Sequence, residues 1–138
     1  MVFDGDCKFC RFWINRWQQI TGERVDYLPF QDAQIGARFP ELAREQFEQA
    51  VQLVETDGRV YGGAEAVFRS LAYNRSLRWS EWIFRNIPGV APVTECGYRL
   101  VAKHRTAFSA LTRFAWGKEI EPPTHRLVRW LFLRSLGV

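Results

Sequence analysis

The spacing of apolar residues predicts a strand, a helix and a second strand at the start of the chain. Val2–Asp4 is a short strand candidate that opens with two apolar residues, and Gly5 ends it. From Cys7 to Thr21 apolar and aromatic side chains recur at three- and four-residue spacing, the period of an amphipathic helix. Arg24–Phe30 then reads as a second strand. Two strands around one helix predict a compact βαβ unit with parallel strands.

The following residues predict two short helices and a hairpin. Gln31–Gln49 has a mixed pattern, which Pro40 divides; because Pro suits the first helical turn, the second helix is expected to begin there. Val51–Glu55 alternates as a strand does, and Arg59–Tyr61 returns after the turn at Thr56–Gly58.

Beyond the hairpin the chain reads as helical. Gly62-Gly63 opens a helix, and all-helical patterning follows from Ser76, with breaks at Pro88-Gly89 and Glu121–Pro123. The order β-α-β-α-β-β-α predicts an α/β (α+β) chain with a thioredoxin-like mixed four-stranded sheet and an α-helical C-terminal extension. We divide it into a core over residues 1–75 and an extension over residues 76–138, packed on or tethered to the core within a single domain.

Composition narrows the class of protein. The chain has 138 residues, 47% of them hydrophobic, which fits one domain with a substantial core. No apolar run approaches the roughly 20 residues of a membrane-spanning helix, and the sequence opens without a charged and apolar signal. A cytoplasmic location is therefore expected.

Charge is unevenly distributed between the two halves. Residues 1–66 carry 7 basic and 11 acidic side chains, whereas residues 67–138 carry 12 basic and 4 acidic ones. The basic second half indicates either a solvated helical face or an anionic partner such as a membrane or an acidic protein surface. Nucleic acid is a less favoured partner. Trp79, Trp82 and Trp116 are expected to pack against other helices.

The most specific feature is the CxxC motif Cys7-Lys8-Phe9-Cys10. An ordinary thiol is largely protonated at neutral pH, but a helix N-terminus stabilises the reactive thiolate. Because Cys7 is nearer the helix start, we expect it to attack a disulfide and Cys10 to resolve the mixed disulfide. Lys8 adds positive charge nearby, whereas the carboxylate of Asp6 opposes the thiolate.

Asp4 and Asp6 each allow a structural and a chemical interpretation. Asp6 occupies the position of a helix N-cap, and Asp4 ends the first strand at a turn. Alternatively, one of them relays a proton to or from Cys10. The cap is the favoured interpretation of Asp6.

Three other interpretations of this segment stay open. A structural zinc site needs four ligands, but there is no second CxxC and no paired histidine, so no metal is expected. An apolar strand followed by Asp4-Gly5-Asp6 also fits an aspartyl-phosphate hydrolase, although a matching later lysine and acidic pair are missing. The two thiols could also simply pack in the structure. Cys96, near the start of a later helix, is expected to be a buried or idle thiol.

Three segments together resemble the DCC family of thiol-disulfide oxidoreductases. The first is Phe3–Cys10, which matches that family's opening DGxCxxC motif, the second is Asp57–Ala66, and the third is Tyr98–Arg105. The resemblance spans about residues 2–105 and implies a thioredoxin-like fold and dithiol–disulfide exchange. It implies no cofactor beyond a redox-active Cys7–Cys10 disulfide.

Two departures and one similarity bear on substrate binding. Thioredoxins carry a cis-Pro before their third strand, where this chain has Glu48–Val51 without Pro, and the pair Lys8-Phe9 replaces Gly-Pro between the cysteines. Gly62-Gly63 is similar to the glutaredoxin pair that contacts glutathione, although a tight strand-to-helix turn is the favoured interpretation. Lys8, Phe9, Gly62 and Gly63 are therefore the candidate substrate-binding residues.

Two functions follow from these observations. The first is a thiol-disulfide oxidoreductase that exchanges electrons at Cys7-Lys8-Phe9-Cys10 with a protein dithiol or a small thiol. The alternative is a redox-inactive thioredoxin-like module that docks on a membrane or protein through its basic aromatic C-terminal helices. Thr124–Leu136, apolar with interspersed Arg, reads as an interfacial helix in that second case.

Overall fold

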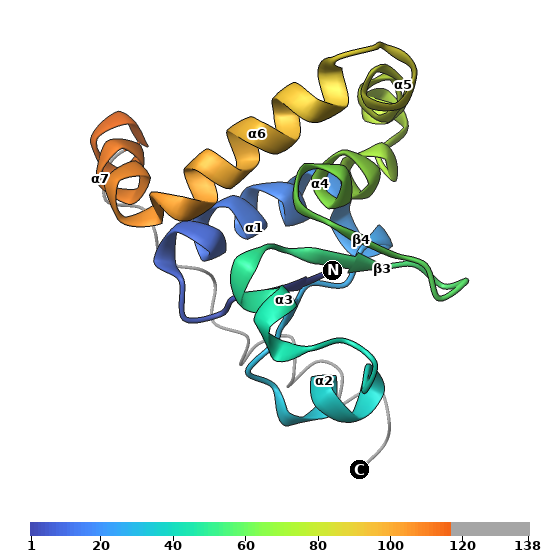
Figure 1. The fold of residues 1–138 in the computed structure, drawn as a ribbon, viewed down its shortest axis with the longest axis vertical. Helices are drawn as coiled ribbons and strands as arrows, with labels where there is room; N and C mark the ends of the chain where they lie inside the picture. The colour runs from blue at the N-terminus through green and yellow to red at the C-terminus, as the bar shows by residue number, and fades with distance from the viewer. Residues whose placement is uncertain (117–138) are drawn as a thin grey trace.

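The computed structural model describes residues 1–116, which form a small mixed sheet with helices on both sides and a helical second half (Figure 1). The strands are β1 (Val2–Phe3), β2 (Leu28–Pro29), β3 (Gln52–Val54) and β4 (Val60–Gly62). The longer helices are α1 (Lys8–Thr21), α4 (Gly63–Ala72), α5 (Arg78–Asn86), α6 (Val90–Lys103) and α7 (Arg105–Trp116). Shorter ones are α2 (Ala33–Arg38) and α3 (Arg44–Gln49), with the 3-10 turns η1 (Gly22–Arg24) and η2 (Arg75–Leu77).

The sheet has the order β2-β1-β3-β4. β1 runs parallel to β2, with Val2 opposite Leu28, and antiparallel to β3, with Val2 opposite Gln52. β3 and β4 form the predicted antiparallel hairpin. The α/β fold class and the thioredoxin-like mixed four-stranded sheet are thus confirmed.

Each face of the sheet has its own apolar core, because neighbouring side chains of a strand point to opposite faces. Phe3 belongs to a cluster with Ile14 of α1 and Ala66 of α4. Val2 belongs to another cluster, with Ile35 of α2 and Phe47 of α3. The end of β1, where the candidate chemistry begins, is therefore fixed from both sides.

The second half of the described chain packs on α1 and α4. α5 and α6 pack on α4, with the rings of Phe68 and Phe84 stacked at a centroid distance of 5.0 Å, and α7 contacts α1. In Figure 1 α6 crosses above α1 and leads to α7, close to the start of α1. The helical half thereby reaches the end of the sheet where β1 passes into α1.

The structure corrects several details. The second strand is limited to Leu28–Pro29. The second short helix begins at Arg44 rather than at Pro40, because Pro40 lies in a turn. Trp79 and Trp82 are each 60% exposed rather than packed between helices. The break at Glu121–Pro123 and the helix predicted for residues 124–136 lie outside the described residues. No described helix combines the length and the apolar character needed to cross a bilayer.

Candidate active site

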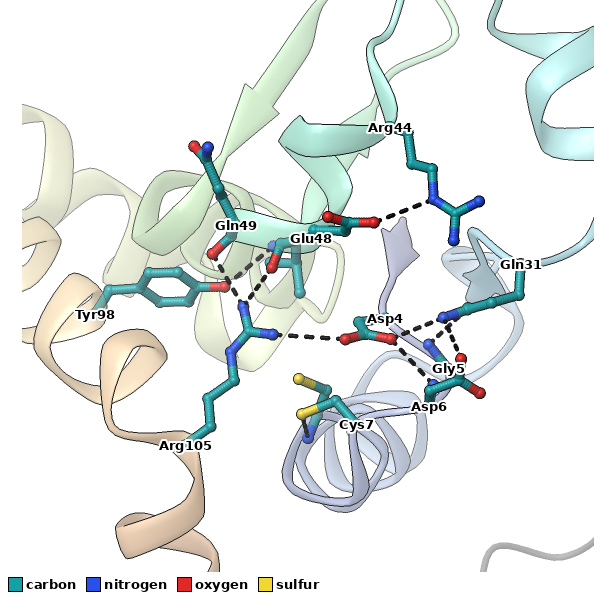
Figure 2. A network of polar contacts seen from close by, with 12 residues as sticks. Asp4, Gly5, Asp6, Cys7, Gln31, Arg44, Glu48, Gln49, Tyr98 and Arg105 are labelled. Atoms are coloured by element: carbon teal, nitrogen blue, oxygen red, sulfur yellow. Dashed lines mark hydrogen bonds and ion pairs between the residues drawn. The ribbon is translucent and has the colours of Figure 1, made fainter.

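The loop between β1 and α1 is held by one glutamine side chain. The Gln31 amide nitrogen donates to Asp4 Oδ1 at 2.8 Å and to Asp6 Oδ2 at 3.2 Å, and its oxygen accepts the Gly5 N–H at 2.9 Å. Asp4 Oδ1 also accepts the N–H of Asp6 at 3.0 Å. Figure 2 shows Gln31 reaching across to all three loop residues, which fixes the approach to Cys7.

Gly5 is required by this close packing. A Cβ atom at position 5 would lie 2.7 Å from Cβ of Pro29 and 2.9 Å from Oε1 of Gln31. The Gly in the first motif is therefore explained by the approach of β2 and Gln31 to the loop.

Cys7 is the N-cap of α1, which corrects the assignment of that role to Asp6. Cys7 Sγ accepts the N–H of Cys10 at 3.2 Å, the contact that an N-cap side chain normally makes with the third helical residue. Asp6 is instead exposed and hydrogen-bonds to Gln31. The first sulfur therefore lies at the positive end of the helix dipole.

These contacts stabilise the thiolate of Cys7. Hydrogen bonding from the thiol of Cys10 lowers the pKa of Cys7 most, and partial burial opposes it. The Cys10 N–H and the Arg105 guanidinium lower the pKa further, whereas Asp4 raises it, and the outcome is a pKa of about 6. At neutral pH Cys7 is thus mainly the nucleophilic thiolate.

Cys10 has the opposite character. Its hydrogen bond to Cys7 and its burial both raise the pKa of its thiol, and the negative charge of Cys7 raises it further. Cys10 therefore keeps its proton while Cys7 is ionised. This asymmetry is the one expected for an attacking sulfur and a resolving sulfur.

Arg105, the first residue of α7, is the cation that acts on this pair. Its Nη1 lies 3.6 Å from Asp4 Oδ2, and its Nη2 donates to the carbonyls of Glu48 and Gln49 at 3.0 Å each. Figure 2 shows the guanidinium between Asp4 and the end of α3. Arg105, rather than the exposed Lys8, is therefore the positive charge that lowers the pKa of both thiols.

Tyr98 of α6 makes a second contact with the segment before β3. Its hydroxyl accepts the N–H of Val51 at 3.1 Å. Together, Tyr98 and Arg105 occupy three main-chain polar groups of Glu48–Val51, the stretch in which thioredoxins carry their cis-Pro. The described residues contain no cis peptide bond.

An apolar groove of about 530 Å³ borders Cys10, the second sulfur of the cysteine pair. It lies between α1, α4, α6 and α7, and we call it the aromatic groove. Cys10, Asp4 and Arg105 line it where it meets the cysteine pair. Further lining residues are Phe9, Trp13 and Trp17 of α1, Thr94, Gly97, Val101 and Ala102 of α6, and Phe108, Leu111 and Thr112 of α7.

The predicted residues are only partly brought together. Asp4, Phe9 and Cys10 line the groove, with the Phe9 ring 6.3 Å from that of Trp13, and Cys7 is joined to Cys10 by its hydrogen bond. Lys8 points to the surface.

Gly62 and Gly63 lie in a separate hollow that no cysteine lines. They open α4 as predicted, with Gly63 at a φ of +63°. The carboxylate of Glu95 lies at this helix start, where its Oε1 accepts the N–H of Glu65 at 3.0 Å. Substrate binding by the two glycines stays a prediction, and a ligand carboxylate would compete there with Glu95.

Residue-by-residue reasoning missed Arg105, Tyr98 and Gln31. The signal for the first two was present, because they begin and end the third family-like segment, although they lie on two successive helices, α6 and α7. Gln31 carried no signal, since its role depends on the distance between β2 and the loop. Cys96 is exposed in the middle of α6 rather than buried near a helix start.

Within residues 1–116, no three His, Cys, Asp or Glu side chains are arranged to hold a metal ion. Comparison with curated proteins and with solved structures gives no significant match. A family model, DCC1-like thiol-disulfide oxidoreductase, matches residues 1–111, which include the loop, both cysteines, Tyr98 and Arg105. The chain belongs to the DCC1-like thiol-disulfide oxidoreductase family.

Proposed function

We propose that this protein is a thiol-disulfide oxidoreductase whose working couple is Cys7 and Cys10. The observation that carries the proposal is the position of Cys7 Sγ, which caps α1 and accepts the Cys10 N–H at 3.2 Å. Membership of the family supports a redox role in general, and the cap supports this particular pair.

The exchange begins at Cys7. Its thiolate attacks one sulfur of a partner disulfide, the partner's S–S bond breaks, and the leaving thiolate takes a proton from water. The thiol of Cys10 then loses its proton and attacks Cys7 Sγ, which releases the second partner thiol. Two electrons pass from the protein dithiol to the partner, and a reducing thiol restores the pair by the reverse steps.

Asp4 is the proposed acceptor for the proton of Cys10. Its carboxylate lines the same groove as Cys10, and its charge affects the pKa of both thiols. Arg105 pairs with Asp4 and holds it in this position. Asp6, exposed and bound to Gln31, has a positioning role in the loop instead.

A redox titration tests the proposal. The Cys96→Ser variant removes the exposed third thiol, and the remaining thiols are counted by alkylation and intact mass at defined potentials. We expect one two-electron transition between about −300 and −120 mV, the span of known exchange proteins. Two thiols that stay reduced over this whole span would contradict the proposal.

Trapping identifies the partner. In Cys10→Ser the resolving sulfur is missing, so mixed disulfides on Cys7 should accumulate. The matched Cys7→Ser variant keeps only the more buried sulfur of the pair and should trap none, provided that both variants are made in the Cys96→Ser background, which removes the exposed thiol. Equal trapping by the two variants would mean that Cys7 is not the attacking residue.

A second candidate function is contact with an anionic membrane surface. The observation that favours it is an aromatic and basic face on α5, where Trp79 and Trp82 are each 60% exposed beside the exposed Arg78 and Arg85. Tryptophan and arginine together suit the headgroup region of a bilayer.

Vesicle sedimentation tests this second function. Trp79→Ala combined with Trp82→Ala should reduce binding to phosphatidylglycerol vesicles several-fold, whereas Cys7→Ser should leave it unchanged. Binding that is equal for anionic and zwitterionic vesicles, or absent altogether, would contradict a charge-assisted contact. Neither result bears on the redox proposal, which the titration and the trapping experiment test.

A further inference from the structure

We propose that the aromatic groove selects small, neutral, apolar disulfides as substrates of the cysteine pair, rather than extended peptides or glutathione. This inference rests on the proposed function and adds the class of substrate. Three features of the described residues support it: the occupied main chain beside the cysteines, the neutrality of the groove, and the open space opposite its aromatic wall.

The first feature concerns the segment that would pair with a peptide. A peptide bound in extended form needs free main-chain donors and acceptors along its site. Here the carbonyls of Glu48 and Gln49 are bound by Arg105, and the N–H of Val51 is bound by Tyr98. A peptide backbone would have to displace both side chains, whereas an apolar molecule needs none of these groups.

The second feature is the absence of free charge in the groove. Among the described lining residues Asp4 and Arg105 alone are charged, and they pair with each other. The hydroxyls of Thr94 and Thr112 donate to carbonyls of their own helices, and the Tyr98 hydroxyl, which also lines the groove, accepts the Val51 N–H. A charged ligand such as glutathione disulfide would lose its hydration without gaining a partner, which disfavours its burial.

The third feature is the size and shape of the space. A cavity of about 530 Å³ lies within the range of small-molecule sites. α1 contributes broad aromatic rings on one side, while α6 contributes Gly97 on the other, where a Cβ atom would meet no heavy atom within 4 Å. The space in front of Gly97 is therefore free to take an apolar group whose sulfur reaches the cysteine pair.

The test compares two thiol-modifying reagents that differ only in their transferred group. Methyl and benzyl methanethiosulfonate each transfer an alkylthio group to a thiolate and release the same sulfinate. In a Cys10→Ser and Cys96→Ser background, Cys7 is the single thiol and its adduct is counted by intact mass. We expect the benzyl-to-methyl rate ratio of Cys7 to exceed that of N-acetylcysteine about tenfold, because the ring is buried on binding.

Variants at Gly97 locate this preference in the groove. Gly97→Leu should abolish most of the tenfold preference and Gly97→Ala part of it, while the methyl rate changes less than about twofold. Because Gly97 lies within α6, both substitutions are compatible with the helix. Gly36→Leu is the matched control, since Gly36 is an exposed helical glycine outside the groove, also with no atom within 4 Å of its Cβ position.

Different outcomes overturn the substrate class and the redox couple. A fast methyl reaction with a benzyl ratio equal to that of N-acetylcysteine would overturn the substrate class and leave the redox couple intact. A benzyl preference that survives Gly97→Leu would likewise overturn the role of the groove. A methyl reaction at pH 6.5 no faster than that of N-acetylcysteine, measured in Cys96→Ser with the Cys10 thiol retained, would instead contradict the activated Cys7 on which the proposed function depends.

Discussion

The sheet-bearing part of the chain, residues 1–72, and the helical part, residues 75–116, contribute different components to the candidate site. The first supplies both sulfurs, the helix start that activates Cys7, and the carboxylate of Asp4. The second supplies the guanidinium of Arg105 and the hydroxyl of Tyr98, which bind the segment before β3.

The difference teaches that the helical part takes a direct share in the site. In a thioredoxin, the segment before the third strand helps to dock the substrate backbone. In this chain Arg105 and Tyr98 occupy that segment from outside the sheet, and α6 and α7 form one wall of the aromatic groove. This division predicts that reactivity depends mainly on the first part and substrate access mainly on the second.

The largest expected effect is the difference in oxidation rate between a variant that lacks Cys7 of the sheet-bearing part and one that lacks Cys96 of the helical part. Cys7→Ser should reduce oxidation of the reduced protein by 2-hydroxyethyl disulfide by about a hundredfold or more, because the nucleophile is a thiolate. Cys96→Ser, which removes the exposed thiol of α6, should leave the rate unchanged. Intact-mass analysis over time measures both, and a comparable loss in the two variants would break the comparison.

A smaller effect is expected from the charge that the helical part contributes. Arg105→Met should raise the pKa of Cys7 and slow its alkylation at pH 6 about three- to tenfold, because a nearby cation that favours the thiolate is lost. Arg105→Lys should recover part of the rate, since Lys keeps the charge but not the fork that binds two carbonyls. An unchanged pKa in Arg105→Met would show that α7 has no electrostatic share in the site.

Tyr98→Phe should affect stability more than reactivity. The N–H of Val51 would lose its partner, which should reduce the free energy of unfolding by about 1–2 kcal/mol. Urea denaturation measures this, with Tyr73→Phe at an exposed tyrosine as the control. A large change in the pKa of Cys7 would mean that Tyr98 acts on the sulfurs as well.

The smallest effect is expected at Lys8. Although it lies between the cysteines in sequence, its side chain is exposed, where solvent and salt screen its charge. Lys8→Ala should therefore change the alkylation rate of Cys7 less than about twofold. A decrease in this rate as large as that caused by Arg105→Met would contradict the expectation that Arg105 affects Cys7 more than Lys8 does.

Local patterns predicted the sheet because each element has its own signal. The parallel β1 and β2, the hairpin of β3 and β4, and the helix after the CxxC all follow from apolar spacing and turn residues. The error at Pro40 arose because Pro suits a turn as well as a first helical residue, and here Pro40 lies in a turn.

The site was predictable to the extent that its chemistry is local. The roles predicted for Cys7 and Cys10 follow from their distance to the helix start. That Cys7 rather than Asp6 caps the helix depends on Gln31, which follows β2 and binds the Asp6 carboxylate. Arg105 joins Asp4 across about a hundred residues of chain, which no local spacing reveals. The exposed Trp79 and Trp82 were misassigned because an aromatic side chain on a helix has the same pattern whether a partner covers it or not.

The central claim is that the fold holds Cys7 as a thiolate, and its alkylation rate as a function of pH tests this most directly. The measurement uses Cys96→Ser with a small excess of iodoacetamide, and mass mapping assigns the modified residue. A pKa lowered to about 6 predicts a rate that rises through a midpoint near pH 6 and is constant above about pH 7.5, with modification at Cys7 before Cys10. A midpoint near pH 9, the value of an unperturbed thiol, or equal modification of both cysteines, would contradict the account.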